Sequence, residues 1–124
     1  MKKIISSKDA PLAVGPYSQA VENNGTIYIS GQLPIDQSTG KIPDNIEQQT
    51  EQCLKNISYI LKEAGYSLED VVKTTVLLDD LGNFSDMNKV YAEFFKSEMP
   101  ARVCYQVVKL PKDAKVEIDA IAVK

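Results

Sequence analysis

Val71-Val72-Lys73-Thr74-Thr75-Val76-Leu77-Leu78 lies between two segments of helical pattern and is rich in β-branched residues. Because such side chains pack well on a pleated sheet, the segment predicts a central strand. Before it, apolar residues recur in steps of three and four over residues 46–64, which predicts an amphipathic helix. Asp44 or Asn45 is expected to cap the start of this helix, and Gly65 to end it.

A second helix and two further strands are predicted after the central strand. Apolar residues at helical spacing run from Phe84 to Phe94, and Asn83 occupies the position of a helix cap. Segments 101–108 and 116–123 are rich in strand-forming residues. Because only a short loop around Pro111–Asp113 separates them, we expect these two strands to pair as a hairpin.

The N-terminal part predicts another hairpin, since Asn23-Asn24-Gly25 separates the β-prone segments Tyr17–Glu22 and Thr26–Ser30. The resulting order is strands, helix, strand, helix, two strands, which favours an α+β fold with two helices packed on one face of a mixed sheet. Segment 116–123 leaves apolar side chains on the other face. We therefore expect one domain over residues 1–124, assembled as a homo-oligomer with pockets between subunits.

The composition predicts an ordinary soluble protein. Of the 124 residues, 44% are hydrophobic, and no apolar run approaches the length of a membrane span. The N-terminal segment turns polar too early for a signal peptide, so we expect a cytoplasmic protein. In that compartment Cys53 and Cys104 are expected to be free thiols.

Charge and the absence of histidine narrow the possible functions. The net charge of −3 and the sequence pI near 4.9 remove the attraction that supplies most non-specific nucleic-acid affinity, so we do not expect a nucleic-acid partner. With no histidine, Ser-His-Asp and Cys-His catalytic sets are excluded, and the motifs of zinc, dinucleotide and nucleotide-phosphate sites are missing. We expect any catalysis to proceed without a metal or cofactor.

Arg102 and Glu117 are the leading candidate site residues, because each places a charge in an otherwise apolar strand. An arginine held by a strand grips a carboxylate through two parallel hydrogen bonds, and a partly desolvated glutamate can transfer protons. The predicted hairpin sets Glu117 opposite Val107, roughly 16 Å along the strand from Arg102. The pair therefore either meets across a subunit interface or follows another register.

Taken singly, the candidates also fit ordinary structural roles. Arg102 and Glu117 are of types that most often form surface ion pairs. Tyr17 is typical of a packed ring, Ser30-Gly31 of a strand end, and Asn88 of an exposed helix position. Their joint match to one family raises the functional interpretation above these alternatives.

Several segments together carry that match. They are Gly15-Pro16-Tyr17-Ser18-Gln19-Ala20, Ile29-Ser30-Gly31-Gln32-Leu33-Pro34, Val72-Lys73-Thr74-Thr75-Val76, Asn88 with Tyr91 and Phe94-Phe95, Pro100-Ala101-Arg102, Leu110-Pro111-Lys112-Asp113 and Val116-Glu117-Ile118. The chain closely resembles the Rid family, also called YjgF, over essentially its whole length. The resemblance implies a chorismate-mutase-like fold, a homotrimer with sites between subunits, and hydrolysis of 2-imino acids or their enamines, such as 2-iminobutanoate and 2-iminopropanoate, to 2-oxo acids and ammonia.

The resemblance also assigns roles. Arg102 would clamp the substrate carboxylate, and Glu117 would position or activate the attacking water. The remaining site residues would bind the substrate or line its pocket. Tyr17 would contribute its hydroxyl, and Ser30 and Gly31 their backbone. Asn88 would form part of the pocket wall, and the Cys104 backbone carbonyl would face the imine nitrogen. The implied substrates are reactive enamines released by pyridoxal-phosphate enzymes such as threonine dehydratase.

Two other function classes remain open from the sequence. Some members of the family are described as ribonucleases or inhibitors of translation, although acidic charge and missing histidine argue against that activity here. A non-catalytic module that senses a 2-oxo acid would use the same cleft.

Val103 and Tyr105-Gln106 depart from the family pattern and are expected to alter substrate preference rather than reaction type.

Overall fold

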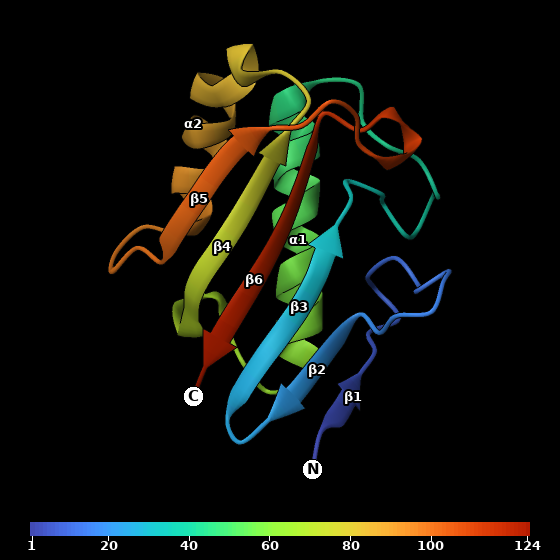
Figure 1. The fold of residues 1–124 in the computed structure, drawn as a ribbon, viewed down its shortest axis with the longest axis vertical. Helices are drawn as coiled ribbons and strands as arrows, with labels where there is room; N and C mark the ends of the chain where they lie inside the picture. Colours follow the sequence, from blue (N-terminus) through green and yellow to red (C-terminus); the bar gives the residue numbers. More distant parts are fainter.

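The computed structural model describes residues 1–124 as one mixed six-stranded sheet with two helices on the same face (Figure 1). The strands are β1 Lys3–Ile5, β2 Ala20–Asn23, β3 Thr26–Gln32, β4 Val71–Leu78, β5 Ala101–Gln106 and β6 Val116–Val123, and the helices are α1 Ile46–Glu63 and α2 Phe84–Phe94. The spatial order is β1-β2-β3-β6-β4-β5, and only β4 and β5 run parallel. The predicted α+β class is confirmed.

The predicted hairpin between the last two strands is wrong, because β4 lies between them. The β4–α2–β5 segment forms a crossover that returns β5 parallel to β4 at the edge of the sheet. β6 then enters the centre, antiparallel to both β3 and β4. This order suits the residues: β6 buries four alternate apolar side chains, whereas β5 carries a charge and exposed polar groups that belong at an edge.

The N-terminal hairpin is confirmed with shifted bounds. Asn24 and Gly25 both have positive φ, 51° and 77°, as a tight turn between twisted strands requires. β2 begins at Ala20, so Tyr17 and Ser18 lie in the preceding loop, and the short strand β1 was not predicted. At its far end β3 departs from regular pairing with β6 between Ile29 and Gln32. That irregularity lies within the predicted site.

Both helices begin and end close to their predicted bounds. Asn45 caps α1 by accepting a hydrogen bond from the Gln48 amide at 2.8 Å, and Gly65 follows its end with a φ of 81°. A 3₁₀ turn precedes α2; Asn83 holds its cap position but makes no capping side-chain bond. Neither helix is both long and apolar enough to cross a membrane.

The hydrophobic core is one cluster of 22 buried residues. It includes the inward side of α1 and the helix-facing side chains of β3, β4 and β6. The opposite face of the sheet has no covering element, and Tyr28, Val103, Tyr105 and Val123 are each close to half exposed there. The predicted apolar open face is therefore present.

Candidate functional site

Arg102 lies at the start of edge strand β5 and is held by α2. Its Nη1 donates a hydrogen bond of 2.7 Å to Oδ1 of Asn88, and its guanidinium carbon lies 4.8 Å from the ring centroid of Tyr91 and 5.6 Å from that of Phe84. The ring contacts have the geometry of cation–π interactions. No carboxylate of the chain forms an ion pair with Arg102. The guanidinium is thus oriented by neutral groups and keeps donors for an external anion.

The Tyr91 ring that contacts Arg102 is itself held in place by a hydrogen bond. The hydroxyls of Tyr91 and Thr74 share a buried hydrogen bond of 2.8 Å, which fixes the tyrosine ring to β4. Burial raises the pKa of Tyr91, so its phenol stays protonated at neutral pH. A pocket opens at this place, lined by Asn88, Tyr91, Ala92, Met99, Pro100 and Arg102.

Cys104 lies two residues beyond Arg102 and therefore on the same side of β5. Burial raises the pKa of its thiol, and the nearby charge of Arg102 offsets part of that rise. The sulfur is accordingly a thiol and not a thiolate at neutral pH. A protonated thiol is a weak nucleophile, and the chain has no histidine to activate it.

Glu117 lies on β6 and points to the open face of the sheet, opposite to its buried neighbours Val116 and Ile118. Its carboxylate rests on the backbone of Gly31, where any Cβ would overlap it. Burial raises the pKa of Glu117, and the negative charge of Asp119 raises it further. Glu117 therefore holds a proton more readily than an exposed glutamate does.

Tyr17 and Gly31 line one pocket beside Glu117, but Ser30 has a structural partner. Ser30 Oγ donates a 2.6 Å hydrogen bond to the Ser18 carbonyl, which ties β3 to the loop that carries Tyr17. The Tyr17 side chain is 52% exposed. The pocket contains Pro11, Leu12, Val14, Tyr17, Gln19, Gly31, Gln32, Leu33, Ile35 and Lys112.

Lys112 lines the pocket that holds Tyr17, although it is not among the predicted site residues. Gly31 lines the same pocket, and the φ of 58° at Lys112 places that residue in the left-handed region. Asp113 follows with a φ of 55°. Two successive non-glycine residues in this conformation are unusual and tend to occur at functional sites. The Leu110-Pro111-Lys112-Asp113 segment, which is among those that resemble the family, was the available signal, but no site role was predicted for Lys112 itself.

The predicted residues therefore form two groups within one chain. Arg102 and Asn88, with Cys104 beside them, lie on the helix side at the edge; Glu117 and Gly31 lie on the open face. Arg102 pairs with Thr74 of β4, and Glu117 pairs with Leu77. Three residues along the strand and two strand spacings separate the backbones by roughly 14 Å. One chain does not bring the two charges together.

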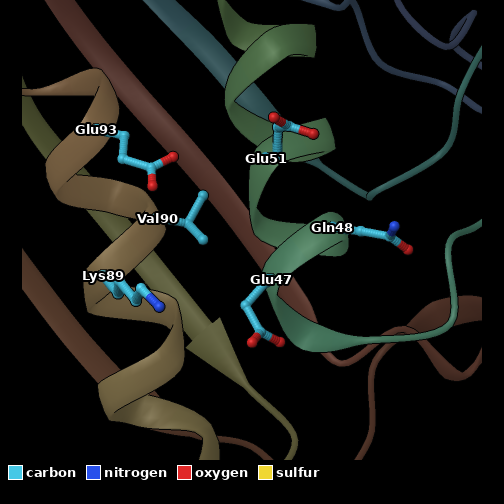
Figure 2. Close-up of a pocket in the computed structure, with 6 residues that line it drawn as sticks. All are labelled: Glu47, Gln48, Glu51, Lys89, Val90 and Glu93. Carbon is cyan, nitrogen blue, oxygen red and sulfur yellow. The ribbon is translucent and has the colours of Figure 1, made fainter.

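A separate groove lies between the helices and holds none of the predicted residues (Figure 2). Glu47 and Glu51 of α1 and Glu93 of α2 surround it, together with Lys89. Its excess negative charge would repel a carboxylate substrate. No group of three or more cysteine, aspartate and glutamate side chains is placed to hold a metal ion.

Comparison with known proteins supplies independent information. The family model for endoribonuclease L-PSP matches residues 7–124. A RutC family protein of Sinorhizobium fredii is 56% identical over 118 residues, covering 94% of each chain. A 2-iminobutanoate/2-iminopropanoate deaminase of Bos taurus is 52% identical over 125 residues, covering 100% of this chain and 91% of the relative. The solved structure of a Rid-family protein of Yersinia pestis superposes with a TM-score of 0.97 at 46% identity and covers all of both chains.

Proposed function

The chain belongs to the endoribonuclease L-PSP family, which contains the Rid proteins, and from this membership we propose that it hydrolyses 2-imino acids to 2-oxo acids and ammonia. The observation that carries the proposal is Arg102, a positioned cation that has a pocket beside it and no anion of its own chain. Full-length relatives named 2-iminobutanoate/2-iminopropanoate deaminase support it.

Arg102 supplies binding and orientation. Its free N–H groups donate two parallel hydrogen bonds to the substrate carboxylate, which fixes the adjacent C=N carbon. Asn88 and the Tyr91 ring hold the guanidinium in place before the substrate arrives. Because the clamp is built in advance, little binding energy is lost in ordering it.

Glu117 supplies proton transfer. It takes a proton from water as the water oxygen bonds to the imine carbon and the C=N π electrons move to nitrogen, and it returns that proton to the nitrogen to give a carbinolamine. Glu117 then takes the carbinolamine hydroxyl proton and delivers it to the amino group as the C–N bond breaks, so ammonia leaves and the C=O bond forms. The raised pKa of Glu117 brings it nearer to neutral pH, which suits a group that must both accept and release a proton.

We propose that the two groups of residues meet between copies of the chain in a homotrimer. A cyclic assembly joins one surface of each copy to a different surface of the next, so Arg102 of one subunit faces Glu117 of its neighbour. The apolar open face supports this arrangement, since Val103 and Tyr105 would otherwise remain exposed.

The remaining predicted residues would complete the intersubunit cleft. Tyr17 would offer its hydroxyl to the substrate, Ser30 and Gly31 their backbone, and Cys104 its carbonyl to the imine nitrogen, with Asn88 in the wall. Substrates of this class arise where pyridoxal-phosphate enzymes such as threonine dehydratase release enamines. A ribonuclease role gains no support from the site, because the groove between the helices is acidic and the chain lacks histidine.

The test is release of 2-oxobutanoate from 2-iminobutanoate generated in situ by threonine dehydratase, in the presence of an imine-scavenging competitor. We expect the protein to accelerate release and Arg102→Ala to abolish the acceleration. Lys89→Ala is the matched control, because it removes a cation from the acidic groove instead. Binding of 2-oxobutanoate without turnover would show a sensing module, and equal rates with and without protein would refute the proposal.

A further inference from the structure

We propose that three buried polar residues on one face of α1 are positioning residues for the reaction, because they hold the backbone segments that carry Gly31 and Glu117 in register. The residues are Gln49, Cys53 and Asn56, called here the polar stripe of α1. They follow the spacing i, i+4, i+7 and are 3%, 0% and 0% exposed. The inference rests on the proposed function for its catalytic meaning.

Asn56 holds the chain where it leaves β3. Its Nδ2 donates to the carbonyls of Leu33 and Ile35, at 3.1 and 3.0 Å, and its Oδ1 accepts from Nε2 of Gln52 at 2.9 Å. Strand pairing of β3 with β6 ends at Gln32, so these carbonyls have no strand partner. Asn56 replaces that partner and fixes a loop that lines the Tyr17 pocket.

Cys53 contacts both segments at the residues next to the site. Its Sγ lies 3.1 Å from the Gln32 carbonyl and 3.7 Å from that of Val116, in the range of sulfur hydrogen bonds. Burial, with the charge of Glu117, raises the pKa of this thiol well above its usual range. The sulfur therefore keeps its proton and can act as a donor.

Gln49 fixes the start of β6. Its Oε1 accepts from the Lys115 amide at 2.8 Å, two residues before Glu117, while its Nε2 donates to the Pro43 carbonyl at 2.7 Å. The stripe thus reaches β6 through Gln49, both strands through Cys53, and the loop after β3 through Asn56.

The consequence for catalysis follows from the contact between Gly31 and Glu117. The carboxylate rests on the Gly31 backbone without room for a Cβ, so a small shift of either segment displaces it. Displacement of a reacting group by about 1 Å can reduce a rate about a hundredfold. An apolar stripe would fill the same space but leave the register of these segments to packing alone.

The experiment compares Asn56→Leu with Thr50→Val. Thr50 is also fully buried on α1, but its hydroxyl bonds only the Ile46 carbonyl of the same helix. We expect Asn56→Leu to lower kcat at least about tenfold with KM changed less than about twofold, since Arg102 lies elsewhere, and Thr50→Val to keep both. The pKa of the Glu117 carboxyl, followed by carbon-13 NMR, should fall in Asn56→Leu only, because the loosened loop admits water.

Cys53 provides a second pair if Asn56→Leu does not fold. Cys53→Ala removes the donor and should reproduce the kcat loss, whereas Cys53→Ser restores a donor and should recover activity. The inference is overturned if Asn56→Leu and Thr50→Val, or the alanine and serine variants, share the same kcat and the same Glu117 titration. If the wild type has no imine turnover, the proposed function fails, and the Glu117 titration alone decides the positioning role.

Discussion

Arg102 and Glu117 lie on the two strands that flank β4, and their side chains point to opposite faces of the sheet. Different residues contact each charge. Asn88 and Tyr91 of α2 contact the Arg102 guanidinium, and the Glu117 carboxylate packs against the backbone of Gly31 in β3. Because β4 separates them, rotation of side chains within one chain does not join them. In the proposed homotrimer, Arg102 of one subunit would meet Glu117 of its neighbour.

Complementation between inactive variants should restore activity. Arg102→Ala and Glu117→Gln are each expected to be inactive as pure proteins. When they are unfolded together, refolded and assembled at equal amounts, a site between subunits is intact when it receives both native residues, which occurs in about a quarter of cases. We therefore expect about a quarter of wild-type turnover in the mixture, measured as 2-oxobutanoate release.

The control is the double variant Arg102→Ala/Glu117→Gln refolded with either single variant. Such a mixture always lacks one native residue throughout and should stay inactive. Failure of the complementary mixture, with both proteins folded and assembled, would place Arg102 and Glu117 in independent sites.

Arg102→Lys should not preserve the clamp. Lysine keeps the charge but loses the planar fork and its contact with the Tyr91 ring. Loss of one charge-assisted hydrogen bond, about 1.5–3 kcal/mol, predicts a fall in kcat/KM of roughly tenfold to a hundredfold. Steady-state kinetics against Lys89→Arg, an exposed exchange in the other groove, would check this, and an unchanged kcat/KM would exclude bidentate recognition.

Local sequence patterns predicted which segments form helices and strands better than they predicted which strands pair. The period of α1, the β-branched run of β4 and the turn at Asn24-Gly25 each express a local preference, and all three are present. The predicted pairing of β5 with β6 was wrong because burial, and not proximity in sequence, decides the order of these strands. β6 buries four side chains and takes the centre, whereas Arg102 and Gln106 keep β5 at the edge.

The site residues show the same division. Arg102 and Glu117 stand out as charges in apolar strands, but their distance apart depends on strand order, which the sequence does not encode locally. The sequence predicted no functional role for Lys112 or for the polar stripe of α1, since a lysine in a turn and an asparagine on a helix fit ordinary structural roles. Their significance comes from the pocket beside Lys112 and from the unpaired carbonyls that Asn56 reaches.

The pH dependence of kcat should report Glu117. As the proposed base it must be ionised, and burial together with Asp119 raises its pKa, so activity should fall on acidification at a higher pH than the ordinary glutamate value of about 4.3 would give. Asp119→Asn removes the nearby negative charge but keeps an oxygen for the Thr75 amide. We expect this variant to move the acid limb to lower pH, and an unmoved limb would assign it to another group.

Stability should depend on the same ionisation. The pKa of Glu117 is higher in the folded state than in the unfolded state. At pH values between these two pKa values the folded state binds the proton more tightly, so the free energy of unfolding decreases as pH rises through that window. Glu117→Gln lacks this loss. Denaturant unfolding should find the variant more stable than wild type at pH 7, with the difference vanishing below about pH 4. An equal difference at both pH values would show a packing effect instead.

Gly31→Ala should separate folding from function most directly. The added Cβ would overlap the Glu117 carboxylate, which must then move. Because Glu117 is only partly buried, its side chain has room to move without unfolding β3. We expect a fall in kcat of about a hundredfold, because the displaced carboxylate no longer aligns the water. Gly40→Ala is the matched control: it strains a backbone with a φ of 73° and meets nothing within 4 Å. If the two variants lose stability alike but only Gly31→Ala loses kcat, the glycine serves to place the carboxylate; full activity in Gly31→Ala would remove Glu117 from the reaction.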